Sequence, residues 1–308
     1  PTADWGYEDW IGPVWASAFF MIPDALECYS GDITAIERIY PVCEAYLAYL
    51  GRRLDEDGTV TYGIGDWVYY DTPTPTDYST TLFYYHQNVL MARFSELLGK
   101  ESAPYSAKAA YLKDLVNRKY FDAENCIYAN GSQAAEAMAL MLGVVPEEYC
   151  AKVAANLNQS IVDNNYYLDF GSVGSKFVPR VLADYGYAET VYTMMTREEI
   201  PSWGAWLNQG LTTLAERWAL DMVKFRDSSA NHVFLGDISA WMTNYLAGIR
   251  YDENDRGFRH IVIKPHVVGD LEWVSATYHS VKGEIAVSWH REGDKVHLKV
   301  SIPANTTA

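Results

Sequence analysis

Residues 257–265 read Gly257-Phe-Arg-His-Ile-Val-Ile-Lys-Pro265, and at this stretch the spacing of apolar residues along the chain changes. After it, apolar and polar residues alternate with a period of two, which is typical of strands that bury one face. In the last such segment, apolar residues occupy every second position from Val296 to Ile302. The predicted strands are Arg259–Lys264, Leu271–His279, Gly283–His290 and Lys295–Ile302.

Before Gly257, apolar residues recur at steps of three and four, which predicts helices joined as hairpins. Because the helices and the strands come in separate runs, the sequence predicts two domains rather than one α/β sheet. We expect a mainly α domain over residues 1–256 and an antiparallel β-sandwich, truncated after Ile302, over residues 257–308. The predicted helices are Pro13–Tyr29, Thr34–Leu50, Ser79–Leu98, Ser106–Phe121, Gly131–Leu142, Glu147–Ile161, Ser172–Ala183, Ala188–Thr196 and Phe234–Leu246.

The composition excludes several classes of protein. The chain has 40 acidic and 24 basic residues, a net charge of −16, and no basic stripe, so a nucleic-acid partner is not expected. The longest apolar run, Val14 to Ile22, is far shorter than the roughly 20 residues that span a bilayer. The four cysteines show neither CxxC pairing nor a nearby histidine, so we expect buried free thiols.

The familiar catalytic motifs are absent, which leaves carboxylate and aromatic chemistry. The sequence has no GxSxG, HExxH or Walker motif and no GxGxxG that opens a helix after a strand. Glu216 lies beside Arg217 in an aromatic stretch that begins at Pro201. A carboxylate held near rings could activate a water molecule, but on spacing alone a solvated helix face that pairs Glu216 with Arg217 is the favoured interpretation.

Other candidates have equally plausible structural roles. Asn231 and His232 precede a predicted helix, where polar side chains can point into a cavity, although a lone histidine more often has a structural role. Asp66 and Trp67 end the turn Tyr62-Gly-Ile-Gly-Asp66-Trp67 and could combine hydrogen bonding with ring stacking on a sugar. Trp15 and Trp203 could add stacking walls, with core packing as the simpler role for each.

An ordered series of motifs resembles the glycoside hydrolase family 78 α-L-rhamnosidases, and it spans nearly the whole chain. The end of the chain, from Gly257 to Thr307, resembles their C-terminal β-domain. Single pieces are weak signals, whereas the ordered set is specific. The motifs are Gly12-Pro-Val-Trp15, Gly65-Asp-Trp67, Tyr128-Ala-Asn-Gly-Ser-Gln133, Leu168-Asp-Phe-Gly-Ser-Val-Gly174, Pro201-Ser-Trp-Gly204, Thr212-Thr-Leu-Ala-Glu-Arg-Trp218, Ser229-Ala-Asn-His232 and Leu246-Ala-Gly-Ile249.

This resemblance implies an (α/α)6 toroid and inverting hydrolysis of terminal α-L-rhamnosides, with no metal or organic cofactor. It implies that Glu216 is the general base, that His232 lines the same pocket and orients sugar or base, and that Trp67 contacts the substrate. Asp66, Trp203, Trp15 and Asn231 complete the predicted substrate-binding set.

The resemblance also implies that the general acid lies upstream of Pro1. We therefore expect a fragment, N-terminally incomplete, that is poorly soluble and inactive alone and that comes from a periplasmic or extracellular bacterial enzyme. Two alternatives stay open at this point. One is another (α/α)6 enzyme such as an uronyl hydrolase, and the other is a non-catalytic carbohydrate-binding module.

Overall fold

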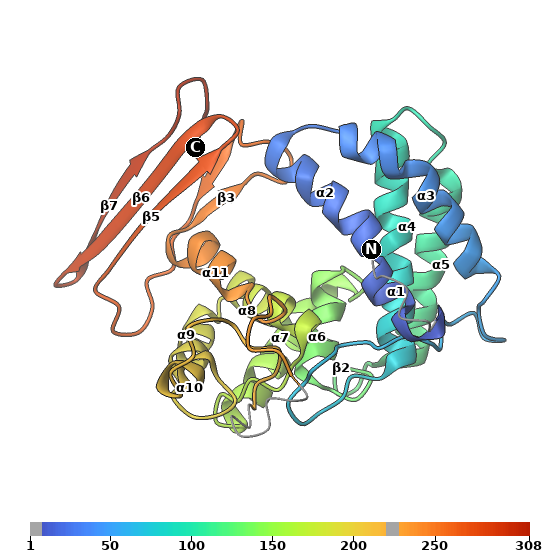
Figure 1. Ribbon diagram of the computed structural model, residues 1–308, viewed down its shortest axis with the longest axis horizontal. Coiled ribbons are helices and arrows are strands. Elements are labelled where there is room, and N and C mark those ends of the chain that lie inside the picture. Colours follow the sequence, from blue (N-terminus) through green and yellow to red (C-terminus); the bar gives the residue numbers. More distant parts are fainter. Residues whose placement is uncertain (1–7, 220–227) are drawn as a thin grey trace. The chain divides into compact units, whose positions relative to one another are not determined.

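The computed structural model describes residues 8–219 and 228–308, which form two compact units (Figure 1). The first unit comprises residues 1–18 and 43–238, and the second comprises residues 19–42 and 239–308. Within the described residues, no helix combines the length and the apolar character needed to cross a membrane.

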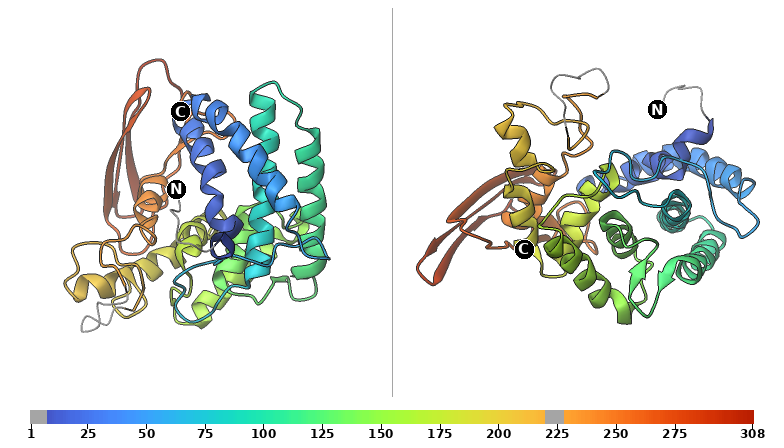
Figure 2. Two further views of the ribbon diagram at one scale, coloured as in Figure 1. Left: turned by 45° about the vertical axis from the view of Figure 1, so that its right-hand side comes forward. Right: turned by 90° about the horizontal axis from the view of Figure 1, so that it is seen from below.

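The first unit is built from helical hairpins, as the sequence predicts (Figures 1 and 2). The helices α4, α6 and α8 pack side by side in that order, and each packs against the helix that follows it in the chain. A two-stranded hairpin of β1 (Phe121–Asp122) and β2 (Ile127–Tyr128) lies between α5 and α6. The helices are α1 (Glu8–Ala16), α4 (Thr76–Leu97), α5 (Ala103–Tyr120), α6 (Gln133–Met141), α7 (Glu147–Asp163), α8 (Ser172–Asp184), α9 (Ala188–Thr196) and α10 (Trp203–Asn208).

Burial separates an inner from an outer layer of helices. In α4, 15 of the 22 residues are buried, and in α6 every residue from Gln133 to Ala139 is buried. By contrast, α7 buries only the stripe of Val153, Ala154, Leu157 and Ile161. A single apolar stripe at helical spacing is typical of an outer helix that faces the core on one side.

Three helical segments differ from the prediction by more than a few residues at their ends. The predicted helix Pro13–Tyr29 is two helices that meet at Ser17, whose hydroxyl donates to the carbonyl of Val14. The short helix α10 was not predicted. The last predicted helix begins only at Ile238, since residues 233–236 form a turn in which Gly236 N–H donates to the carbonyl of Val233.

The second unit contains the helices α2 (Ala18–Ser30) and α11 (Ile238–Trp241), a π-helical turn η2 (Met242–Leu246), and the C-terminal strands. Helix α3 (Thr34–Gly51) begins in this unit, where the carboxylate of Asp32 accepts a hydrogen bond of 2.9 Å from Thr34 N–H and caps the helix. Of the five strands, β3 had not been predicted from the sequence. The strands are β3 (Ile249–Tyr251), β4 (Ile261–Ile263), β5 (Trp273–Ser280), β6 (Gly283–Glu292) and β7 (Lys295–Ser301).

The strands form two antiparallel sheets, β3–β4 and β5–β6–β7. One face of β6 is buried in a core cluster made of Ala247, Ile249, Phe258, Ile261, Ile285 and Val287. The alternation predicted for β7 is present in its register, because Val300 lies opposite Val287 and Leu298 lies opposite Trp289. The whole of β7 is nevertheless exposed, whereas Val287 and Trp289 are buried.

Helix α2 is joined to the C-terminal segment of its own unit by a cluster of charged residues. The guanidinium of Arg256 lies 3.2 Å from a carboxylate oxygen of Asp24 and 2.9 Å from one of Glu27. Gly257 N–H donates to the carbonyl of Cys28 at 2.9 Å. All four cysteines are free, as expected, and three of them are buried.

Candidate active site

Asp66 holds the loop before α4 against the start of helix α8. Its carboxylate accepts hydrogen bonds from the backbone N–H groups of Gly171 (2.7 Å), Val173 (2.7 Å) and Gly174 (3.1 Å). The N-cap residue of α8 is Gly171, which has no side chain to cap the helix, so Asp66 supplies the cap from 105 residues upstream. Burial raises the pKa of Asp66 to about 6, against the lowering effect of the three N–H donors.

A second carboxylate ties the same loop down a few residues later. The Oδ1 atom of Asp169 accepts hydrogen bonds from the backbone N–H groups of Asp71 (2.7 Å) and Thr72 (2.9 Å). Asp66 therefore reaches from the loop to the helix start, and Asp169 reaches back to the loop. Both ends of the segment that carries Trp67 are fixed.

Trp67 lies between these two anchors, and its backbone touches the start of α8. Its carbonyl accepts a 2.8 Å hydrogen bond from Ser172 N–H. A Cβ atom at Gly171 would lie 2.1 Å from that carbonyl oxygen, so only glycine allows this approach. The indole ring is half-buried, and the guanidinium carbon of Arg217 lies 5.7 Å from its centre, within cation–π range.

Glu216 is held by a short antiparallel pairing between two loop segments. Its own N–H donates to the carbonyl of Ser229 (2.9 Å), and Ser229 N–H donates back to Glu216 Oε2 (3.0 Å). Two residues earlier, the carbonyl of Leu214 accepts from His232 N–H at 2.9 Å. The side chain of Glu216 is half-buried, and Oε1 accepts no hydrogen bond from the described residues.

Behind Glu216 and Arg217, a group of aromatic rings forms a rigid wall. The indole N–H of Trp218 donates to the carbonyl of Phe170 (2.6 Å), and that of Trp206 donates to the carbonyl of Trp218 (3.0 Å). Trp203 packs edge-on against Trp218 at 5.0 Å and donates its indole N–H to the carbonyl of Leu235 (2.9 Å). Because every indole N–H here has an acceptor, the wall fixes the segment before and after Glu216.

His232 lies against a second aromatic pair. Its ring centre is 3.6 Å from that of Phe234, and Phe234 packs edge-on against Trp15 at 5.0 Å. Phe234 N–H donates to His232 Nδ1 at 3.3 Å, which in a neutral imidazole leaves the proton on Nε2 as a donor. Asn231 is exposed at the turn just before His232.

The structure thus brings Glu216, Trp67, Asn231 and His232 to one group of loops, with Trp15 joined to it through Phe234. Asp66 and Trp203 belong to the same region, but their side chains are buried and their polar atoms are engaged with the protein. Their observed contacts position neighbouring residues, and the sugar contacts expected of them stay a prediction.

Several residues that shape this site escaped the sequence analysis. Gly171, Asp169 and Ser229 act through backbone contacts that are set by distant loops. One signal was available for the cap: a predicted helix that begins after Gly171 lacks a capping side chain of its own, and a glycine there calls for an acceptor from elsewhere.

Two groups of metal-ligating side chains occur in the described residues, and neither lies in this site. One is Asp24, Glu27 and Cys28, whose carboxylates are already paired with the cationic Arg256. Burial raises the pKa of the Cys28 thiol to about 11, which disfavours the thiolate that a metal requires. The other group lies in strands β6 and β7.

Comparisons with known proteins bear on the fold and on the family. Residues 2–246 match the bacterial α-L-rhamnosidase six-hairpin glycosidase domain, and residues 248–308 match the bacterial α-L-rhamnosidase C-terminal domain. A curated α-L-rhamnosidase of Streptomyces avermitilis is 29% identical over 301 residues, which cover 96% of this chain and 29% of that protein. One of Formosa agariphila is 28% identical and is matched over 96% of this chain and 33% of its own length.

Solved structures give the same result. The Streptomyces avermitilis α-L-rhamnosidase, solved in complex with L-rhamnose, superposes with a TM-score of 0.89 at 28% identity, over 95% of this chain and 29% of that one. The α-L-rhamnosidase from Dictyoglumus thermophilum gives a TM-score of 0.88 at 29% identity, over 96% of this chain and 34% of that one. The chain therefore spans about a third of the length of the relatives it matches. These matches confirm the expected mainly α six-hairpin fold with a C-terminal β-domain, and the chain belongs to the bacterial α-L-rhamnosidase family.

Proposed function

We propose that this chain supplies the general-base half of an inverting α-L-rhamnosidase, which releases terminal α-L-rhamnose from plant or bacterial glycosides. The observation that carries the proposal is the hydrogen bonding of the Glu216 carboxylate. One oxygen is fixed by the N–H of Ser229, while the other accepts no hydrogen bond from the described residues. A general base needs this combination of a fixed position and a lone pair directed at water.

In the proposed reaction, Glu216 removes a proton from a water molecule as its oxygen attacks the anomeric carbon of the rhamnose. The glycosidic oxygen leaves from the opposite face and takes a proton from a second carboxyl group, commonly about 6.5–9.5 Å from the base. The product then has the opposite anomeric configuration from the substrate.

The neighbouring residues suit the recognition of a neutral sugar. The half-buried ring of Trp67 offers a flat apolar surface, and its rigid anchoring keeps the cost of ordering it low. His232 can donate Nε2–H to a hydroxyl group or to the attacking water. The guanidinium of Arg217 packs over the Trp67 ring, 5.7 Å from its centre, and helps to hold that ring in place.

The second carboxyl group is proposed to come from a part of the enzyme outside residues 1–308. This part of the proposal rests on the share of the relatives that the chain covers, 29% and 33% of their lengths. It implies that the 308-residue chain alone does not turn over an aryl α-L-rhamnoside, while a longer protein that contains it does.

The test is the change Glu216→Gln in the longer enzyme, assayed on an aryl α-L-rhamnoside. Glutamine keeps the shape of the side chain and an acceptor for Ser229 N–H but cannot take a proton, so kcat is expected to fall by at least about 100-fold with little loss of stability. Glu198→Gln is the matched control, since Glu198 is exposed and lies outside the site.

Three outcomes would count against the proposal. Near-normal turnover by Glu216→Gln would remove Glu216 from the role of base. NMR during the first turnovers measures the anomeric configuration of the released rhamnose. A retained configuration would exclude the inverting mechanism even if Glu216 is essential. Saturable rhamnose binding with no turnover by the longer enzyme would favour a carbohydrate-binding module instead.

A further inference from the structure

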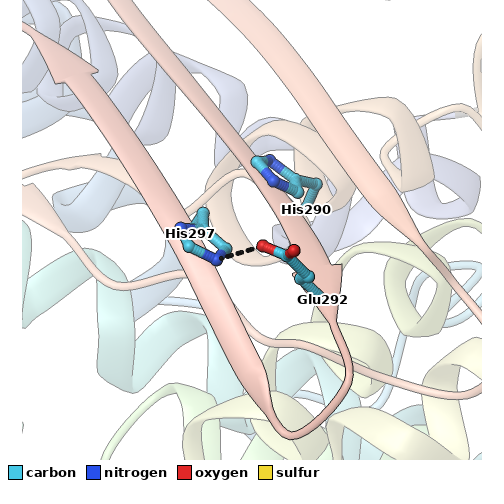
Figure 3. A group of neighbouring side chains, drawn as sticks. All are labelled: His290, Glu292 and His297. Atoms are coloured by element: carbon cyan, nitrogen blue, oxygen red, sulfur yellow. Dashed lines mark ion pairs between the residues drawn. The ribbon is translucent and has the colours of Figure 1, made fainter.

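Two histidines and a glutamate gather on the exposed face of the β6–β7 hairpin, in the C-terminal unit (Figure 3). His290 on β6 and His297 on β7 are direct partners across the two strands. Glu292 follows His290 by two residues, so its side chain emerges on the same face of β6. Trp273, the partner of His290 on β5, is exposed, which identifies this face as the outer one.

The three side chains already face one another. The two imidazole rings lie nearly parallel, with an interplanar angle of 10° and centres 4.9 Å apart. His297 Nε2 lies 2.9 Å from Glu292 Oε2. One ligand atom from each residue falls within 4.8 Å of the others, although the residues come from two different strands.

This spacing is close to that of a metal site. A tetrahedral ion with bonds of about 2.1 Å holds its ligand atoms about 3.4 Å apart. Closing the difference requires a movement of about 1 Å by side-chain ends, and these side chains are free to make it because 48% of His297 and 75% of Glu292 is exposed. The backbone, fixed by the strand pairing of His290 with His297, does not need to move.

The donor set points to one chemical class of cation. Two imidazole nitrogens and one carboxylate oxygen suit Zn²⁺ and the neighbouring divalent transition metals, whereas Ca²⁺ and Mg²⁺ prefer oxygen ligands alone. Lys295 is the cross-strand partner of Glu292, and among the described residues no ion pair between the two is formed, so the ion-pair partner of this carboxylate is His297 itself. The other ligating group among the described residues has a cationic partner, because Arg256 lies within ion-pair distance of both its carboxylates.

We propose that His290, Glu292 and His297 form a binding site for one divalent transition-metal ion, with Zn²⁺ as the probe, and that the bound ion links strands β6 and β7. Strand β7 lies at the edge of its sheet, has β6 as its strand neighbour and is exposed along its whole length. A bond between the strands through the metal would stabilise the native state by mass action. The proposed ion is remote from Glu216 in the sequence and takes no part in the proposed hydrolysis.

The experiment is a calorimetric titration of the 308-residue chain, without a polyhistidine tag, with Zn²⁺ in slightly alkaline buffer. We expect saturable binding of one ion per chain. His290→Ala and His297→Ala should each weaken this binding at least about tenfold, and Zn²⁺ should raise the Tm of the unaltered chain but not of either variant. Ca²⁺ should neither bind at this position nor shift the Tm.

The chain offers a matched control on the same sheet. His279 is exposed and lies 3.9 Å from Glu284, its cross-strand partner, but it has no second histidine opposite it. His279→Ala should therefore bind Zn²⁺ as tightly as the unaltered chain. Absence of saturable binding, or equal loss in His279→Ala and His290→Ala, would overturn the proposal. Circular dichroism of each variant without metal confirms that the fold is kept, so that lost binding reports on the ligands.

Discussion

Glu136 offers a direct test of the energetics of the inner helices. Its side chain is 2% exposed, Oε1 accepts a 2.9 Å hydrogen bond from Tyr128 N–H, and Oε2 has no hydrogen-bond partner among the described residues. Burial raises the pKa of this carboxyl from 4.5 to about 8, against the lowering effect of that hydrogen bond. At neutral pH the folded chain thus holds a proton that the unfolded chain releases.

The sign of the pH dependence follows from this difference. Between pH 4.5 and pH 8 the native state binds more protons than the unfolded state, so the free energy of unfolding falls by about 1.4 kcal/mol per pH unit from this group. By pH 7 the loss amounts to about 3 kcal/mol, and it levels off above the folded-state pKa.

Glu136→Gln removes this titration while keeping an acceptor for Tyr128 N–H. The amide group placed at Oε2 adds a constant cost of about 1 kcal/mol at most, since the protonated carboxyl is equally unpaired. The unaltered chain loses stability from this group as the pH rises, and the variant does not. The difference between their free energies of unfolding should therefore shift by about 3 kcal/mol in favour of the variant from pH 4.5 to pH 7. Urea unfolding, followed by circular dichroism at several pH values, measures this change. Glu148→Gln, on an exposed position of α7, is the control. Parallel stability curves for the unaltered chain and Glu136→Gln would refute the reasoning.

Two further predictions concern the anchors of the two units. Asp66→Ala leaves three backbone N–H groups at the start of α8 without this acceptor, so it should lower the free energy of unfolding by about 2–4 kcal/mol, measured by urea denaturation. In the longer enzyme the same change should raise KM for a rhamnoside by displacing Trp67, and unchanged stability would show that the loop does not depend on this cap. Arg256→Gln removes the guanidinium that contacts both Asp24 and Glu27 and should cost about 3 kcal/mol in the same assay. Arg118→Gln, from an exposed pair with Asp114, should cost less than about 1 kcal/mol, and equal effects of the two changes would contradict the role given to Arg256.

The sequence predicts the helices and strands well where apolar spacing alone determines them. The outer helix α7 and the strands β5 and β6 match their predicted ranges within a few residues, because each buries one regular stripe or face. The short elements α10 and β3 escaped prediction, since six and three residues are too few to display a period. For β3, pairing with β4 determines the conformation, and β4 lies ten residues further along the chain.

The candidate site shows where such prediction ends. Asp66 has the residue type expected of a sugar ligand, yet its carboxylate serves the helix that starts after Gly171, a contact that no local pattern reports. The pairing of Glu216 with Ser229, and that of His290 with His297, likewise depend on which segments lie opposite one another. The order of the motifs along the chain indicated the family, because this order can be read from the sequence even where the contacts of individual residues cannot.

The burial and hydrogen bonding of each site residue indicate whether it can act on a substrate or instead supports the structure of the loops. Glu216 and His232 are half-buried and retain polar atoms that the described protein groups do not use, which is what a group must have if it is to exchange protons or hydrogen bonds with a substrate. Asp66 and Trp218 are buried, and their polar atoms are bonded to the backbone, so changing them disturbs the loops themselves. Changing a residue of the first pair should therefore lower turnover without lowering stability, and changing one of the second pair should lower both.

Trp67 belongs to both groups, because its ring faces Arg217 while its carbonyl is held by Ser172. The choice of substitution therefore decides which role is measured. A change of the Trp67 side chain reports on binding, whereas a side chain added at Gly171 displaces the same residue through its backbone.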